Sequence, residues 1–263
     1  LMSRVLVLVP FAIDAAGVAR RAEQQHEVSL RDDVTYEYRT VRAGPTSFVS
    51  PHDWLLLDLA ILDAGLGAQD EGFDAVVIDT VSDSGADALR SMLDIPVIAP
   101  GRASLIFALT LGRRFGVMAQ WEPALARYEK VLDDWGLRDR CAGVEHFDTP
   151  PDFDTLLDGK EDAVLPKMEA ACQRLVARGA DVICLGSTTM HQAHGHLASV
   201  LDVPVVNPGP LSYKLVETVL SLGLTHSRTA YPRPQQPKPA MVNAMFDAAA
   251  GQRRADDPGG ARG

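Results

Sequence analysis

The sequence predicts an α/β protein made of two similar doubly wound lobes, each built on a parallel sheet, related by a pseudo-twofold axis. Two observations lead to this prediction: an internal repeat, and an alternation of short apolar runs with longer helical patterns. With 263 residues the chain is long enough for two such lobes. We expect a first lobe at 1–112, a second at 113–228 whose last strand and helix cross back to the first, and a proline-rich tail at 229–263.

The repeat relates two predicted strand ends. Residues match at an offset of 107 and then, after one inserted residue, at an offset of 108. The matches are Gly72, Asp74 and Thr80 with Gly179, Asp181 and Ser187, followed by Leu93, Asp94, Pro96, Val97, Pro100, Gly101, Ser104 and Thr110 with Leu201, Asp202, Pro204, Val205, Pro208, Gly209, Ser212 and Thr218. The alternative is that two strand–helix units share only their turn residues.

Four segments in each half have strand character. They lie near 4–9, 34–41, 75–79 and 96–99 in the first half, and near 115–119, 143–148, 181–186 and 204–207 in the second. Most are β-branched apolar runs, typical of strands buried on both faces of a parallel sheet. Residues 34–41 alternate instead, with Tyr36 and Tyr38 on one side, and this alternation predicts an edge strand.

Helical patterns fill the gaps between the strands. Segment 160–178 carries an apolar stripe that includes Cys172 and ends before Gly179. Segment 122–136 has Pro123 in its first turn and ends at Gly136. We expect a short helix at 240–249 in the tail and disorder over residues 255–263.

Composition excludes several classes of function. The net charge is −10, which argues against a nucleic-acid surface or an anionic membrane as partner. Residues 1–10 are expected to form a buried strand rather than a signal peptide, and no apolar run approaches the roughly 18 residues of a membrane span. Cys141, Cys172 and Cys184 show no pairing pattern, which favours a reducing cytoplasm.

Two hydroxyl-rich turns follow equivalent strands and are the predicted ligand site. They span 79–85 and 186–191, and each would present backbone N–H groups at a helix start. Thr80 and Ser187 occupy matching positions in the repeat. The expected substrate-binding residues are Pro10, Val81, Ser82, Gly186, Thr188 and Thr189. The alternative is that these hydroxyls serve only as helix caps.

These turns resemble two motifs of a known superfamily. Residues 77–85 (VIDTVSDSG) and 185–190 (LGSTTM) look like the two cysteine motifs of hydantoin racemases, within the aspartate/glutamate/hydantoin racemase superfamily that also includes arylmalonate decarboxylases and maleate isomerases. The resemblance implies two α/β lobes, an active site between them, and a homo-oligomer. It also implies a pair of thiols that deprotonate and reprotonate opposite faces of a carbon acid.

This sequence departs from that pattern at the reacting groups. Thr80 and Ser187 stand where the two cysteines would be, and Val9-Pro10-Phe11 resembles the decarboxylase branch better. A thiol titrates near 8.5, whereas an aliphatic hydroxyl needs an activating partner to act as base or nucleophile. Three alternatives remain. The two hydroxyls could donate hydrogen bonds to the substrate, or Ser187 could be an activated nucleophile. The cleft could also bind a small ligand without catalysing a reaction.

Two side chains are candidates to activate Ser187. His191 lies four residues later, which would place it one turn on along a helix, and an unperturbed histidine titrates near neutrality. Asp83 is the rival base, with an N-cap role as its alternative. His191, His194 and His196 are not spaced as ligands on one helix face, so no metal is expected.

We therefore predict a cytoplasmic, cofactor-independent enzyme of the racemase/isomerase class, with Thr80, Ser187, His191 and Asp83 as catalytic candidates. Its substrate would be a small carboxylate or a hydantoin-like cyclic amide. One alternative is a hydrolase, lyase or decarboxylase that uses Ser187 with His191 or Asp83. The other is a non-catalytic protein that binds a small ligand in the same cleft.

Overall fold

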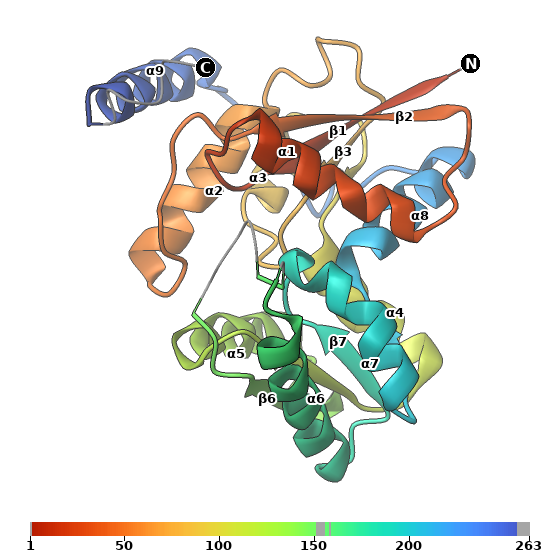
Figure 1. Cartoon of the computed structure of the whole chain (residues 1–263). Coiled ribbons are helices and arrows are strands. Elements are labelled where there is room, and N and C mark those ends of the chain that lie inside the picture. The colour runs from red at the N-terminus through yellow and green to blue at the C-terminus, as the bar shows by residue number, and fades with distance from the viewer. Residues whose placement is uncertain (1, 151–155, 158, 257–263) are drawn as a thin grey trace.

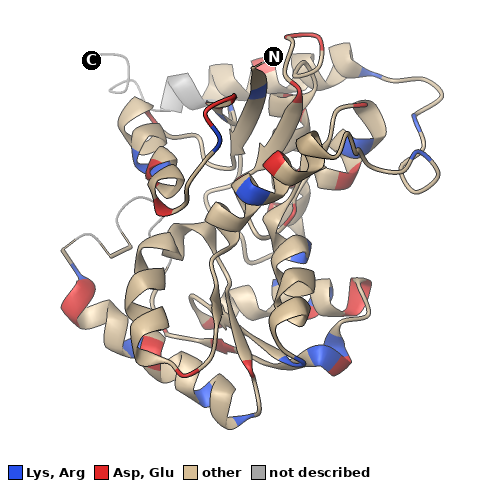
Figure 2. Ribbon diagram, turned by 90° about the vertical axis from the view of Figure 1, so that its right-hand side faces the viewer, with Lys and Arg blue, Asp and Glu red and all other residues tan. Residues whose placement is uncertain are grey.

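Two parallel sheets with helices on both faces form the molecule. The computed structural model describes residues 2–150, 156–157 and 159–256. The two lobes lie one above the other in Figure 1, with the N-terminal lobe at the top. Figure 2 shows Lys, Arg, Asp and Glu scattered over helices, loops and strand ends of both lobes, with the strands drawn largely in the colour of uncharged residues.

The strands of the two sheets have the same order. The first sheet contains β1 (Ser3–Val9), β2 (Val34–Thr40), β3 (Ala75–Ile78) and β4 (Val97–Ile98), in the order β2-β1-β3-β4; the second contains β5 (Phe115–Ala119), β6 (Cys141–His146), β7 (Val182–Leu185) and β8 (Val205–Val206), in the order β6-β5-β7-β8. All pairs are parallel. The predicted fold class is therefore confirmed, and β2 is the edge strand that its alternating pattern predicted.

Register supports the repeat at the level of single residues. Val5 of β1 pairs with Ala75 of β3, and Phe115 of β5 pairs with Val182 of β7, which lies 107 residues after Ala75. Residues of β3 and β7 are buried throughout, as expected for apolar strands in the middle of a sheet.

Helices and short 3₁₀ turns cover both sheets. The first lobe supplies α1 (Ala15–Ala22), η1 (Glu23–Glu27), α2 (Pro51–Gly65), α3 (Ala86–Met92) and α4 (Pro100–Leu111); the second supplies η2 (Glu122–Ala124), α5 (Leu125–Asp134), η3 (Arg138–Arg140), α6 (Glu161–Ala177), η4 (Thr188–Ala193), α7 (His194–Val200) and α8 (Pro208–Ser221). A last helix, α9 (Pro239–Asp256), follows the proline-rich segment.

The last helix of each lobe packs on the sheet of the other lobe. Leu105 of α4 lies in one buried cluster with Cys184 of β7, and Tyr213 of α8 lies in one with Val77 of β3. Figure 1 accordingly shows α4 beside the lower sheet and α8 beside the upper one. Each of these two clusters thus contains residues from both lobes.

Some elements differ from their predicted form. The helix expected at 122–136 is a 3₁₀ turn, η2, followed by α5, which ends at Asp134; Gly136 then takes a φ of 62° that suits glycine. The tail helix is longer than the expected 240–249 and runs to Asp256; its Val242 and Phe246 are buried against the first lobe. Of the residues expected to be disordered, 257–263 lie outside the described part. No described helix is long and apolar enough to cross a membrane.

Candidate active site

The two hydroxyl-rich turns share a position after a strand and one hydrogen bond. β3 ends at Ile78 and β7 at Leu185, so Thr80 and Ser187 each stand two residues beyond a strand. The Thr80 hydroxyl oxygen accepts from the backbone N–H of Ser82 at 3.4 Å, and that of Ser187 accepts from Thr189 at 3.1 Å. Each hydroxyl therefore stabilises its own turn, and Ser187 is also the N-cap of η4, the capping role that the sequence allowed.

Both hydroxyls also line one cavity at the carboxyl ends of the two sheets. Its volume is about 120 Å³, and its lining includes Thr80 and Ser82 from the first lobe and Gln120 and Ser187 from the second. An engineered apolar cavity of about 150 Å³ holds benzene, so the space suits one small molecule. The two turns therefore line the same cavity.

Aromatic side chains form much of the remaining wall. Phe11, which follows β1, meets Phe48 edge to face with ring centroids 5.5 Å apart. The Arg127 guanidinium from α5 lies 5.3 Å from the ring centre of Trp54 on α2, so this contact crosses between the lobes. Such a wall favours a ligand with an apolar or aromatic part.

The start of α2 fixes two of these aromatic residues. Ser50 and Asp53 form a reciprocal capping box, in which each side chain accepts from the other residue's backbone N–H at 3.2 Å. Trp54 comes next in the helix, and its indole N–H donates to the carbonyl of Phe48 at 3.0 Å. The capping box and this hydrogen bond together fix the positions of Trp54 and Phe48 in the cavity wall.

Gly186 lacks a side chain, and this lets two protein groups, rather than a ligand, lie close to its backbone. A Cβ at this position would lie 2.6 Å from the Met118 carbonyl oxygen and 2.8 Å from the Tyr128 hydroxyl. The Tyr128 hydroxyl donates to the carbonyl of Gly186, and burial raises the pKa of Tyr128, which keeps it a donor. Gly186 therefore lines the cavity while the second turn packs tightly onto α5.

The first turn is joined to the second by buried polar contacts. The Arg21 guanidinium pairs with the Asp79 carboxylate at 2.6 Å, with side chains only 4 % and 3 % exposed. It also donates to the Thr188 hydroxyl at 2.5 Å, and that hydroxyl donates to the Asp79 carbonyl at 3.1 Å. The hydroxyl of Thr188, which was expected to bind substrate, thus makes hydrogen bonds between the lobes, and Thr188 is not among the described residues that line the cavity.

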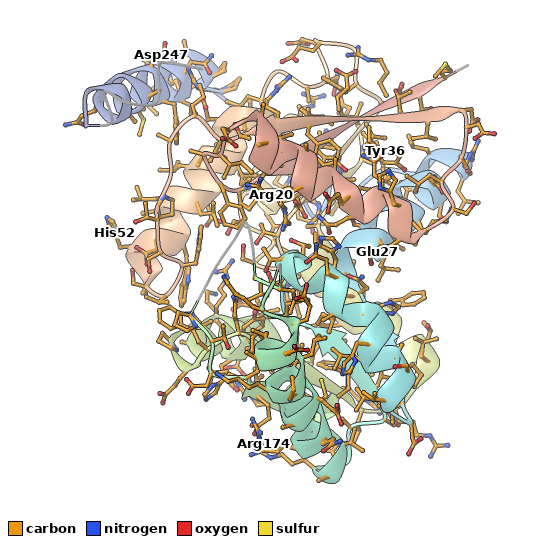
Figure 3. All side chains as sticks on the ribbon, in the orientation of Figure 1. Arg20, Glu27, Tyr36, His52, Arg174 and Asp247 are labelled. Atoms are coloured by element: carbon orange, nitrogen blue, oxygen red, sulfur yellow. The ribbon has the colours of Figure 1, made fainter. Side chains whose placement is uncertain are left out.

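His191 lies in another polar cluster between the lobes. Its ring Nδ1 contacts the carboxylate of Glu27, which also accepts from the Asn207 amide at 2.7 Å. Figure 3 places Glu27 where the upper lobe meets the lower one. His191 is buried and is not among the described residues that line the cavity.

The type of helix explains why His191 faces away from the expected side. Ser187 is followed by a 3₁₀ helix rather than an α-helix. Four residues in a 3₁₀ helix, with about 3.0 residues per turn, rotate a side chain roughly 120° from its starting face. The expected one-turn relation between Ser187 and His191 therefore does not form.

Asp83 caps a helix instead of facing the cavity. Its carboxylate accepts from the backbone N–H groups of Gly101 and Arg102, at 2.6 and 2.7 Å, in the first turn of α4. Its backbone has a φ of 53°, which the two bonds stabilise. Burial raises the pKa of Asp83 despite these bonds, and the residue is not among the described residues of the cavity wall.

The remaining predicted binding residues divide into two groups. Val81, Ser82 and Gly186 line the cavity, whereas Pro10 and Thr189 are not among the described lining residues. Phe11, one residue after Pro10, takes that place on the wall. The Thr189 hydroxyl bonds to that of Ser187 at 2.7 Å and so contacts the site through Ser187.

Most of the lining residues were missed from the sequence, among them Gln120, Trp121, Arg127 and Tyr128. Gln120 follows β5 just as Pro10 follows β1, so the repeat of strand ends was a signal for it. Arg127 and Tyr128 lie on α5, and no local pattern distinguishes them from other helix residues.

Two of the three cysteines, Cys172 and Cys184, are buried. Cys184 lines the cavity, and burial raises its pKa; burial raises the pKa of Cys172 to about 12. Neither thiol is therefore poised to form a thiolate. Over the described ranges, no group of three His, Cys, Asp or Glu side chains could hold a metal ion.

The fold and the cavity define a class: a two-lobed α/β protein with a cavity at the carboxyl ends of both sheets. The chain belongs to the Asp/Glu/hydantoin racemase family, whose model matches residues 16–216. The family resemblance of the two turns is thereby confirmed.

Individual relatives agree with this family. The chain is 26 % identical over 213 residues to a hydantoin racemase from Pseudomonas sp. (strain NS671), covering 81 % of this chain and 84 % of the relative. It superposes on allantoin racemase from Klebsiella pneumoniae with a TM-score of 0.80 and 25 % identity, covering 89 % and 95 % of the two chains. Glutamate racemase from Bacillus anthracis shares the fold, with a TM-score of 0.60 and 16 % identity over 84 % and 82 %.

Proposed function

We propose that this protein is a cofactor-independent isomerase-type enzyme that acts on a small carbon acid, either a carboxylate or a hydantoin-like cyclic amide. The observation that carries the proposal is that Thr80 and Ser187, at equivalent strand ends, line the same cavity. Relatives named hydantoin racemase and allantoin racemase support a reaction that inverts a carbon centre.

The two hydroxyls fit the task of stabilising developing negative charge. When the proton next to a carbonyl leaves, the electron pair of the C–H bond delocalises and charge builds up on the carbonyl oxygen. A hydroxyl has one proton to donate and two lone pairs to accept with. Ser187 uses its oxygen to accept from the Thr189 N–H, so its own proton remains available for a ligand oxygen or for the Thr189 hydroxyl.

One observation favours a second candidate, a protein that binds such a ligand without turning it over. The described residues that line the cavity include no Asp, Glu or His, and burial raises the pKa of the lining thiol, Cys184. A group that accepts the substrate proton is therefore not supplied by those side chains in their neutral-pH forms.

Hydrogen exchange separates the two candidates. A single enantiomer of 5-benzylhydantoin and one of 2-phenylpropionate are incubated with the protein in D2O. Loss of the carbon-bound hydrogen is followed by NMR and inversion by chiral chromatography. We expect exchange faster than in protein-free buffer, and slower in Ser187→Ala and Thr80→Ala. A rise in Tm with either compound, without added exchange, would instead identify a binding protein.

A further inference from the structure

A chain of hydroxyls runs from the cavity into the protein through the first turn. The hydroxyl oxygens of Thr80 and Ser82 lie 3.2 Å apart, and those of Ser82 and Ser84 lie 2.9 Å apart. Thr80 and Ser82 line the cavity, whereas Ser84 is only 1 % exposed. The chain therefore has one end at the cavity and the other end in the protein interior.

Burial of Ser84 sets the direction of this chain. Among the described residues, the hydroxyl of Ser84 bonds to that of Ser82 and to no other group, and water on the outer surface does not reach a side chain this buried. A buried donor without an acceptor costs free energy that folding does not recover. Ser84 is therefore the donor in its bond to Ser82.

The direction of the first bond determines the second. A hydroxyl that accepts a hydrogen bond becomes a better donor, so a chain whose bonds all point one way is favoured over one in which Ser82 accepts twice. Ser82 then donates to Thr80, whose oxygen also accepts from the backbone N–H of Ser82 at 3.4 Å. Both lone pairs of the Thr80 oxygen are thereby used, and its proton is left for a ligand.

The second turn lacks the third member of the chain. At the repeat offset of 107, the counterparts of Thr80, Ser82 and Ser84 are Ser187, Thr189 and His191. The hydroxyls of Ser187 and Thr189 bond at 2.7 Å, but the His191 ring contacts Glu27 instead of Thr189. The third position therefore does not fix which hydroxyl of this pair donates, and Ser187 can donate to a ligand or accept from one.

We propose that Ser82 and Ser84 are positioning residues that make Thr80 a fixed hydrogen-bond donor to the ligand, whereas Ser187 can donate or accept. The two sides of this pseudosymmetric cavity then differ chemically, and an acceptor oxygen of the ligand lies at Thr80. This inference rests on the proposed function only in taking the cavity as the ligand site.

Neutron diffraction tests the direction of the chain directly. Crystals of the ligand-free full chain are soaked in D2O, and the deuterium atom of each hydroxyl is located. We expect the deuterium of Ser84 to point at Ser82, that of Ser82 at Thr80, and that of Thr80 into the cavity. A Thr80 deuterium that points at the Ser82 oxygen would overturn the proposal.

Matched ligands test its consequence for binding. Acetophenone carries a carbonyl acceptor, and α-methylstyrene has a CH2 group in its place; their affinities are measured by NMR titration. We expect Thr80→Val to weaken acetophenone binding by about 3- to 10-fold and Ser84→Ala by about 2- to 5-fold, with α-methylstyrene changing by less than about 2-fold. Because Ser84 acts through Thr80, the double variant should bind acetophenone no more weakly than Thr80→Val.

Ser91→Ala is the control, since it removes a hydroxyl of α3 that donates to the Ala88 carbonyl at 2.7 Å, and it should bind both compounds like wild type. An equal loss for both compounds in Ser84→Ala, or a loss that adds to that of Thr80→Val, would mean that Ser84 only packs the turn and would overturn the proposal. If acetophenone does not bind, or Ser84→Ala does not fold, the neutron result decides.

Neither test depends on turnover. The expected deuterium directions without hydrogen exchange on a substrate would uphold this inference and reject the enzyme. Hydrogen exchange together with a Thr80 deuterium that points at Ser82 would uphold the enzyme and reject this inference. Failure of the inference and failure of the proposed function are therefore distinguishable.

Discussion

Single hydroxyls decide what this site can do. Thr80 and Ser187 each accept one backbone hydrogen bond within their turn and also line the cavity, so each residue both stabilises its turn and borders the proposed ligand site. An aliphatic hydroxyl donates a hydrogen bond well and removes a proton poorly. At this scale the site is better suited to stabilising charge than to generating a base.

Removing the Ser187 hydroxyl tests this role. We expect Ser187→Ala to lower hydrogen exchange on the substrate by about 10²-fold or more, because a donor to the developing oxyanion is lost. The free energy of unfolding should fall by only about 0.5–2 kcal/mol, the cost of a lost cap. Exchange rates and thermal denaturation measure the two effects.

Ser199→Ala is the matched control, since its exposed hydroxyl bonds only to the carbonyl of His196 on α7. Exchange within a factor of two of wild type in Ser187→Ala, together with clear destabilisation, would leave Ser187 as a structural cap. Ser187→Cys then asks whether a thiol at this position raises the exchange rate; two-base racemisation would need Thr80→Cys as well.

Thiol chemistry gives a second prediction at the residue scale. Burial raises the pKa of Cys172 to about 12 and raises that of Cys184, so neither forms a thiolate near neutrality. We expect activity or ligand binding to survive native treatment with iodoacetamide, with mass spectrometry showing no modification at either residue. Rapid stoichiometric inactivation that a ligand prevents would show that Cys184, on the cavity wall, is reactive.

At the scale of elements, the repeat preserves contacts that start the central strands. Asp74 and Asp181 match in the repeat. The Asp74 carboxylate accepts from the backbone N–H of Arg4 at 2.8 Å, and that of Asp181 accepts from Arg113 and Arg114 at 2.8 Å each. Each carboxylate thus satisfies backbone donors where β1 or β5 begins, which explains why an aspartate recurs there.

This contact makes stability depend on pH. Hydrogen bonds from Arg114 and Arg113 hold the pKa of Asp181 below its ordinary value of 3.8. A carboxyl with a lowered folded-state pKa stabilises the fold above its unfolded pKa, and this contribution is lost as pH falls through the folded-state pKa. We expect Asp181→Asn to lower the free energy of unfolding by about 1 kcal/mol at pH 7 and by less below pH 3.

Urea denaturation at both pH values measures this difference, with Asp202→Asn, an exposed change in the same lobe, as control. A loss in Asp181→Asn that is equal at pH 7 and below pH 3 would show that the carboxylate charge is not what stabilises the start of β5.

Prediction from sequence succeeded where the signal is local. The short apolar runs predicted strands, and the repeated positions predicted two equivalent turns. The structure has a strand at each of these runs and a turn after each of the two equivalent strands. The partner of His191 is Glu27, which lies 164 residues away in the sequence, so no local pattern marks this contact. Gln120 and Arg127 likewise become part of the cavity wall only when the second lobe meets the first, so no neighbouring residue in the sequence marks them.

At the scale of the whole molecule, the lobes are joined through their cores and their strand ends. α4 and α8 each pack on the opposite sheet, and the Arg21–Asp79 pair bonds to Thr188 of the other lobe. Separating the lobes would expose apolar surface and a buried ion pair together. The two sheets should therefore unfold as one unit, which also keeps the two hydroxyl turns at a fixed distance.

The Arg21–Asp79 pair provides a direct test of this coupling. Arg21→Met removes the cation and leaves a carboxylate that is only 3 % exposed without its charge partner, a change that typically costs about 3–5 kcal/mol. Because Arg21 also donates to Thr188, we expect hydrogen exchange to rise in β7 of the second lobe as well as in β3 of the first, with thermal unfolding remaining a single transition. The double variant Arg21→Met/Asp79→Leu removes the stranded charge and should recover part of the stability. A variant in which only the first lobe loses protection, or in which calorimetry resolves two transitions, would mean that the lobes fold independently and that the geometry of the cavity depends on some other contact.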